Sequence, residues 1–165
     1  PFRRWPEAAF VDLVASLAAR SPDRRLVLSS GPSDREAANR IALSARERLG
    51  PESADRIVDC GELNLAELRA VIARSRLFIG GDTGPLHIAA TTATPVVGLY
   101  GPTLAERSAP WRDPRVPTAS LFVEGLPCRP CDQRVCVPGD FRCLTGLQPA
   151  AVIAAAEQTL ERSVQ

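Results

Sequence analysis

The stretch RLFIGGDTGPLHIAATTATPVVGLYG, residues 76–101, decides the fold class. Its apolar start predicts a short buried strand and its glycines predict a tight turn. Residues 85–92 then predict a short helix, and residues 94–101 predict a second buried strand. Two strands joined through a helix by short connections pair in parallel, and the helix lies on one face of the sheet.

The rest of the chain continues this alternation. Apolar residues recur at helical spacing or in short runs, which predicts helices over residues 7–20, 33–50, 64–75 and 148–164 and strands over residues 24–31, 55–61 and 119–125. Ser33 and Glu36 have the spacing of a capping box, and Gly50 predicts the end of that helix. The sequence therefore predicts an α/β fold, a Rossmann-like parallel sheet with helices on both faces. Such sheets bind ligands at the carboxyl ends of their strands.

Length and composition indicate one globular domain. The chain has 165 residues, of which 45% are hydrophobic and 24% charged. Its net charge of +1 gives no general attraction to nucleic acid. No apolar run approaches the roughly 20 residues of a membrane-spanning helix. No signal peptide is recognisable, and the chain opens on PFRRWP without a methionine. We therefore expect a fragment of a longer protein, cut near a domain boundary.

The GGDTG turn is the candidate binding site. Glycines let a ligand approach the backbone closely, and the start of the following helix offers unpaired N–H groups. Thr83 adds a hydroxyl group, and His87 lies in the first helical turn, so a diphosphate would suit the arrangement. A structural interpretation stays open beside this one: Asp82 or Thr83 only caps the helix, and His87 only forms a hydrogen bond inside the fold.

The segment LFIGGDTGPLHIAATTATPVVGLYGPT resembles the signature of glycosyltransferase family 9, the lipopolysaccharide heptosyltransferases and their relatives. The segments RRWP, LVLSSGPSDREAANRI and LNLAELRAVIARSRLFIG resemble other parts of that family in the same order. The resemblance covers essentially the whole chain. It implies the C-terminal, donor-binding half of a GT-B glycosyltransferase. The general base would lie in an N-terminal domain that is absent here, so we expect no catalytic residue in this chain and no activity of the isolated domain.

The resemblance also implies a reaction. Family members transfer heptose with inversion, commonly from ADP-heptose, to the lipopolysaccharide core. The chemistry requires no cofactor, and the lipid A–core acceptor would bind through the absent domain. It further implies a cytoplasmic location, peripheral at the inner membrane. Two alternatives remain from the sequence. The first is an interaction module without transferase activity, which binds a nucleotide or is stabilised by a metal ion. The second is another GT-B enzyme such as a sugar-nucleotide epimerase.

Site residues follow from the resemblance position by position. Four residues match the signature and should line the diphosphate and sugar end of the donor pocket: Asp82, Thr83, Gly84 and His87. Because a carboxylate repels phosphate, Asp82 should bind sugar hydroxyls or orient the loop and His87. Arg3 stands where the family has a phosphate-binding lysine, and its alternative is a solvated surface arginine.

Three more residues are weaker candidates. Glu36, or else Asp34, would bind the ribose hydroxyls, and a capping-box role is the alternative for Glu36. Leu63 would pack on the base, or it is an ordinary core leucine. Thr103 in GPT approaches the donor, or it belongs to a plain turn.

The cysteines form a separate pattern inside a Pro- and Cys-rich insertion at residues 125–148. Cys128, Cys131, Cys136 and Cys143 are spaced C-x2-C-x4-C-x6-C. Four cysteines within sixteen residues favour a structural zinc site in which thiolates fill all four coordination positions. An iron–sulfur cluster uses the same ligands, and disulfides are the rival interpretation.

Overall fold

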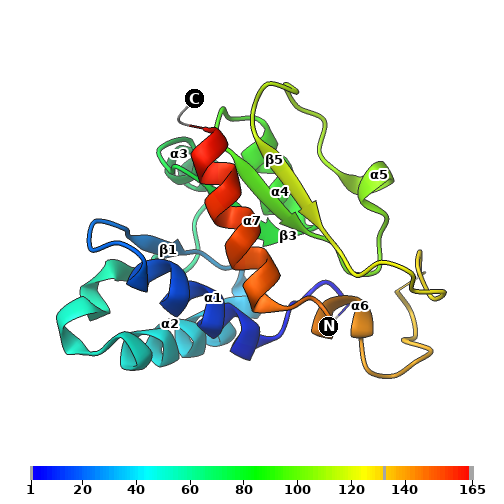
Figure 1. The fold of residues 1–165 in the computed structure, drawn as a ribbon, viewed down its shortest axis with the longest axis horizontal. Helices are drawn as coiled ribbons and strands as arrows, with labels where there is room; N and C mark the ends of the chain where they lie inside the picture. Colours follow the sequence, from blue (N-terminus) through cyan, green and yellow to red (C-terminus); the bar gives the residue numbers. More distant parts are fainter. Residues whose placement is uncertain (1, 132, 164–165) are drawn as a thin grey trace. The chain divides into compact units, whose positions relative to one another are not determined.

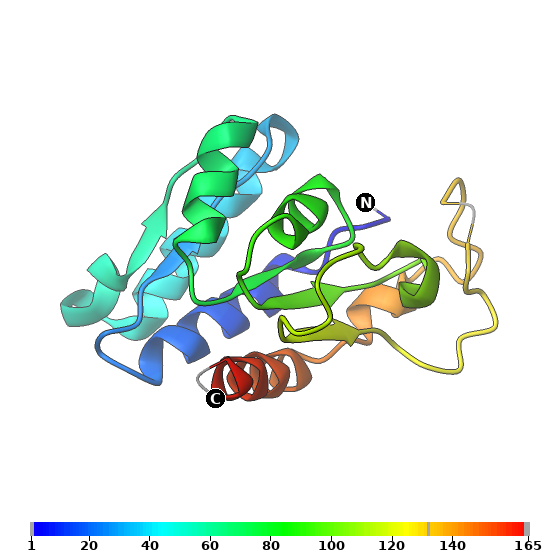
Figure 2. The same cartoon turned by 90° about the horizontal axis from the view of Figure 1, so that it is seen from above.

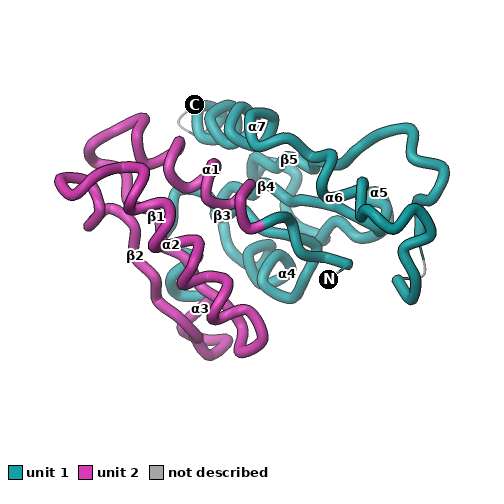
Figure 3. The backbone as a smooth tube through the Cα atoms, turned by 90° about the horizontal axis from the view of Figure 1, so that it is seen from below, with its two compact units in different colours: residues 1–6, 69–165 teal, residues 7–68 magenta. Residues whose placement is uncertain are grey.

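The computed structural model describes residues 2–131 and 133–163, which cluster into two compact units. One unit consists of residues 1–6 and 69–165 and the other of residues 7–68 (Figure 3). The prediction that the chain is a single domain stays a prediction.

The unit of residues 7–68 packs two helices against a two-stranded parallel sheet. Strand β1 (Leu26–Leu28) pairs with β2 (Ile57–Asp59), with Leu26 opposite Ile57. Its helical elements are α1 (Glu7–Ala19), η1 (Pro32–Asp34), α2 (Arg35–Leu49) and η2 (Pro51–Arg56), and α3 (Leu65–Ala73) begins at its end. The core between the two long helices and the sheet is made of Val11, Val14, Ala15, Ile41, Ala42, Ala45 and Ile57. Their 3–4 residue spacing on each helix is the amphipathic pattern that predicted these helices.

The predicted cap of α2 is wrong. The chain passes through the one-turn helix η1 before α2 begins at Arg35, so Asp34 is the N-cap residue in place of Ser33. No side-chain cap hydrogen bond is found there among the described residues. Pro32 explains the shift, because proline suits the first turn of a helix and therefore starts the short helix η1 early. The predicted end is confirmed: Gly50 has a φ of +81° and donates its N–H to the Arg46 carbonyl.

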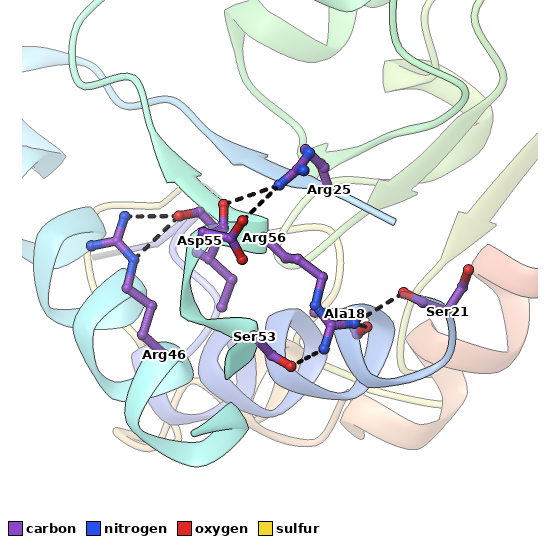
Figure 4. A network of polar contacts seen from close by, with 8 residues as sticks. Ala18, Ser21, Arg25, Arg46, Ser53, Asp55 and Arg56 are labelled. Carbon is purple, nitrogen blue, oxygen red and sulfur yellow. Dashed lines mark hydrogen bonds and ion pairs between the residues drawn. The ribbon is translucent and has the colours of Figure 1, made fainter. Parts of the chain in front are cut away.

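Arginine side chains bind backbone carbonyls of neighbouring elements in this unit (Figure 4). Arg46 donates two hydrogen bonds to the Ile57 carbonyl of β2, at 3.2 and 2.8 Å. Arg56 donates to the carbonyls of Ala18, in the last turn of α1, and Ser21, just after it, at 2.8 and 3.1 Å. The planar guanidinium group presents five N–H donors, so one side chain can satisfy more than one carbonyl.

The other unit contains the parallel sheet whose first two strands were predicted from residues 76–101. Strands β3 (Phe78–Gly81), β4 (Val96–Leu99) and β5 (Thr118–Leu121) are all parallel, in that order. Helix α4 (Gly84–Ala90) covers one face of the sheet and α7 (Pro149–Arg162) the other (Figures 1 and 2). Every residue of β4 is buried, as expected of a central strand with both faces covered. The predicted α/β, Rossmann-like fold is confirmed.

Four short elements of the described chain were not predicted: η1, η2, α5 (Ala105–Ser108) and α6 (Arg142–Thr145). They span only one or two turns, which is too short for an amphipathic period to be recognised.

Among the described residues, no helix is both long enough and apolar enough to cross a membrane.

Candidate functional site

The candidate site lies where β3 ends and α4 begins. The Asp82 N–H donates to the Leu99 carbonyl of the neighbouring strand at 3.1 Å, which extends the ladder by one residue beyond β3. Thr83 is the N-cap residue of α4, and Pro85 follows in the first turn. The sequence thus places the turn at the carboxyl edge of the sheet, as predicted.

Asp82 is the centre of this site. Its side chain is 5% exposed, and its Oδ2 accepts a hydrogen bond of 2.6 Å from the Thr103 hydroxyl group. Arg3 Nη1 lies 3.7 Å from the same oxygen, and His87 Nε2 lies 3.7 Å from Oδ1. A carboxylate buried to this extent leaves little surface for sugar hydroxyls, and its contacts are those expected of a group that orients the loop and His87. Both roles of Asp82 stay predictions.

Of the remaining signature residues, Gly84 and His87 are exposed, whereas Thr83 is half-buried and donates its hydroxyl group to the Gly81 carbonyl at 3.4 Å. The His87 side chain is 53% exposed although its ring faces Asp82, so it is accessible to a ligand. Gly84 is exposed, and apart from its chain neighbours and the backbone of its own helix, no heavy atom of the described residues lies within 4 Å of a Cβ placed there.

No side-chain cap bond from Thr83 is found within the described part of the chain. Thr83 is therefore not a side-chain cap of α4 in the described structure, and the Asp82 side chain is bonded to Thr103. Because α4 has only seven residues, a ligand here would depend on the Arg3 and His87 side chains more than on the helix dipole.

The N-terminal segment brings Arg3 to this turn. Trp5 is buried, and its indole N–H donates to the Leu147 carbonyl at 2.9 Å. Arg3 donates from Nη1 to the Asp82 carbonyl at 2.9 Å. A Cβ on Gly81 would lie 3.2 Å from the Arg3 carbonyl, so glycine allows the two backbones to approach. Arg3 is thus held at the site with 43% of its side chain exposed, and it is not merely a solvated surface residue.

Thr103 contacts the buried carboxylate. Its hydroxyl group donates a hydrogen bond to Asp82, and its approach to the donor stays a prediction. Burial raises the pKa of neighbouring Tyr100, and the charge of Asp82 raises it further, while a hydrogen bond with Ser120 lowers it. Sequence reasoning did not detect the bond between Thr103 and Asp82, because 21 residues separate the partners and only strand pairing joins them.

The predicted ribose and base residues belong to the other unit. Glu36 lies in the first turn of α2 with its side chain 95% exposed, and its carboxylate is 4.0 Å from Arg40. It forms an ion pair along the helix, and because Asp34 is the N-cap residue of α2, Glu36 does not stand at the capping-box position. Leu63 is half-buried, so it is not a core leucine. It precedes Asn64, whose side chain accepts hydrogen bonds from the N–H groups of Ala66 and Glu67 at 3.0 Å and so begins α3. Binding of ribose by Glu36 and of base by Leu63 stays a prediction.

The four clustered cysteines share one neighbourhood. All are free and half-buried. Burial raises the pKa of the Cys143 thiol, and the charges of Cys128, Cys136 and Cys131 raise it further. Within residues 2–131 and 133–163, however, no group of three or more histidine, cysteine or acidic side chains is arranged to hold a metal ion. The thiols as placed do not form the tetrahedral set that zinc requires, and zinc binding stays a prediction.

Elemental analysis tests the zinc prediction. Protein purified anaerobically should contain about one zinc per chain if the four thiolates are ligands. Changing Cys143→Ser should lower that content, whereas Cys60→Ser, which removes a cysteine outside the array, should not. Metal-free protein with five titratable thiols would exclude the zinc site.

Comparison with known proteins identifies the family. A sequence model described as glycosyltransferase family 9 (heptosyltransferase) matches residues 1–140. The chain belongs to glycosyltransferase family 9. It is 29% identical over 162 residues to lipooligosaccharide heptosyltransferase 2 of Campylobacter jejuni, covering 98% of this chain and 48% of that protein. It is 32% identical over 164 residues to lipopolysaccharide heptosyltransferase 3 of Escherichia coli, covering 98% and 44%. The chain therefore spans about half the length of these family 9 relatives.

The fold agrees with this family. The structure titled ADP-heptose lps heptosyltransferase II, from E. coli, matches with a TM-score of 0.79 at 21% identity and covers the whole of this chain and 44% of that one. A family 9 glycosyltransferase from Veillonella parvula matches with a TM-score of 0.76 at 23% identity, covering 98% and 43%. The predicted membership of family 9 and the predicted fold are both confirmed.

Proposed function

We propose that this chain is the donor-binding part of an inverting heptosyltransferase that uses ADP-heptose and acts on the lipopolysaccharide core. The observation that carries the proposal is the cluster of Arg3, Asp82, His87 and Thr103 at the carboxyl edge of the sheet. Parallel α/β sheets bind nucleotides at this edge. Among this chain's relatives are named heptosyltransferases, and one E. coli structure is titled as a complex with ADP.

The proposed chemistry is stabilisation of the leaving group. Cleavage of the bond between the sugar and the diphosphate leaves negative charge on the nucleotide. Arg3 supplies a permanent positive charge, and His87 supplies an N–H donor when neutral and a charge when protonated. Donors oriented before the reaction stabilise such charge most effectively, because they need not reorganise. Asp82 provides this orientation, since Arg3 and His87 both face its carboxylate. The general base would come from the part of the enzyme beyond this chain.

Calorimetric titration with ADP, UDP and GDP tests the proposal. ADP should bind more tightly than the other two nucleotides. Arg3→Ala should weaken ADP binding by about ten- to a hundredfold, because a charge-assisted contact to the diphosphate is worth about 1.5–3 kcal/mol. Arg107→Ala, which removes an exposed arginine of α5, is the matched control and should bind as the wild type does.

The outcomes separate the candidates. A loss in Arg3→Ala that shrinks as salt is raised supports contact with phosphate, whereas a salt-independent loss indicates a packing role. Preference for UDP or GDP would keep the transferase and change the sugar class. Nucleotide binding without heptose transfer in the complete enzyme would favour the interaction module. Family 9 membership already favours a transferase over an epimerase.

A further inference from the structure

The cysteine-rich segment, residues 125–148, contacts the candidate site at three points. Gln133 Oε1 accepts a hydrogen bond of 2.8 Å from Arg3 Nε. The Cys131 N–H donates to the Pro102 carbonyl at 3.1 Å. Arg129 donates to the Thr103 carbonyl, and its guanidinium group also lies 4.7 Å above the ring of Phe122. The segment therefore holds both Arg3 and the turn that carries the partner of Asp82.

We propose that Gln133 is a positioning residue for the donor diphosphate: it orients the guanidinium group of Arg3, and the Cys131 sulfur holds Gln133 in place. This inference rests on the proposed function, since it assumes that Arg3 binds the diphosphate.

The geometry at Arg3 supports the first part. Two hydrogen bonds fix its guanidinium plane, one from Nη1 to the Asp82 carbonyl and one from Nε to Gln133. Both hydrogen-bond acceptors are neutral, and the Asp82 carboxylate lies 3.7 Å from Nη1. At Nε, an amide oxygen orients the guanidinium group without adding a second negative charge to that of Asp82, whereas a carboxylate there would neutralise Arg3 further. Glutamine is thus an acceptor suited to an arginine that must bind phosphate.

The geometry at Gln133 supports the second part. Its φ is +63°, in the left-handed region that residues other than glycine rarely adopt. Its backbone N–H donates to Cys131 Sγ at 3.2 Å, which stabilises that conformation locally. Cys131 is in turn joined to Pro102 through its own N–H. A chain of contacts therefore runs from the thiol to Gln133 and from there to Arg3.

A double-mutant cycle measured by calorimetry with ADP tests the inference. Gln133→Ala should weaken ADP binding by about three- to tenfold, because Arg3 keeps its charge and loses its orientation. In the Arg3→Ala background the same change should have no further effect, since the residue that it orients is gone. Gln158→Ala, which removes an exposed glutamine of α7, is the matched control and should leave binding unchanged.

Two further variants separate positioning from a general effect on folding. Gln133→Glu should keep Arg3 in place and still weaken ADP binding, with a smaller dependence on salt than the wild type shows, because the new charge cancels that of Arg3. Cys131→Ser should weaken ADP binding as Gln133→Ala does and should have no further effect in the Arg3→Ala background. Cys60→Ser, in the other unit, should not change binding.

Each failure has a distinct meaning. Wild-type ADP affinity in Gln133→Ala, or losses that add fully in the double variant, would overturn this inference while Arg3→Ala still supports the donor site. Wild-type affinity in Cys131→Ser would overturn the role of the sulfur. Unchanged ADP affinity in Arg3→Ala would overturn the proposed site itself, and this inference with it.

Discussion

Replacing Trp5 with alanine should lower the free energy of unfolding by about 3–5 kcal/mol, the usual cost of truncating a buried aromatic side chain. Trp5 is 4% exposed, and its loss would also leave the Leu147 carbonyl without its indole donor. Because Trp5 anchors the segment that carries Arg3, ADP affinity should fall together with stability. Urea unfolding followed by circular dichroism measures the first effect, and calorimetry measures the second.

Trp111→Ala is the control that the chain itself offers. Trp111 is 97% exposed, so its removal should change the free energy of unfolding by no more than about 0.5 kcal/mol. If the two tryptophan variants were equally stable, Trp5 would not be a core residue. If Trp5→Ala lost stability and kept full ADP affinity, the N-terminal segment would not be what brings Arg3 to the nucleotide.

Asp82→Ala should lower the free energy of unfolding by about 2–3 kcal/mol, because it leaves the partly buried Thr103 hydroxyl group without its acceptor and opens a small cavity. It should also weaken ADP binding by about tenfold, since Arg3 and His87 lose the carboxylate that orients both. Chemical unfolding and calorimetry on the same preparation measure the two effects.

Asp82→Asn separates geometry from charge. Its amide oxygen can still accept the Thr103 hydrogen bond, so the loss of stability should be about 1 kcal/mol or less. If Asp82→Ala retained wild-type stability, the carboxylate would not have the buried structural role described above. If Asp82→Ala lost stability and kept wild-type ADP affinity, Asp82 would contribute to the stability of the fold and not to ADP binding.

Local patterns were sufficient to predict the alternation of elements. The helical spacing of small apolar residues predicted α1, α2, α3 and α7, and the short apolar runs predicted the five strands. The cap at Ser33 was wrong because Pro32 starts a short helix one turn earlier, which shows that helix ends depend on more than the residue types near them.

Part of the candidate site could also be predicted from the sequence. The signature residues Asp82, Thr83, Gly84 and His87 are neighbours in the chain, so a local motif places them at one turn. Arg3 was included only through the resemblance to family 9. Gln133 and Arg129 were not predicted, because an irregular segment with no periodic pattern brings them to the site.

The sequence by itself determined the α/β class, the family and the turn at which a ligand would bind, since each depends on residues close together in the chain. Only the tertiary structure decided how those residues are arranged. It buries Asp82 beside Thr103, Arg3 and His87, which no local motif indicates. That burial depends on contacts between residues up to 79 positions apart, which chain folding alone brings together.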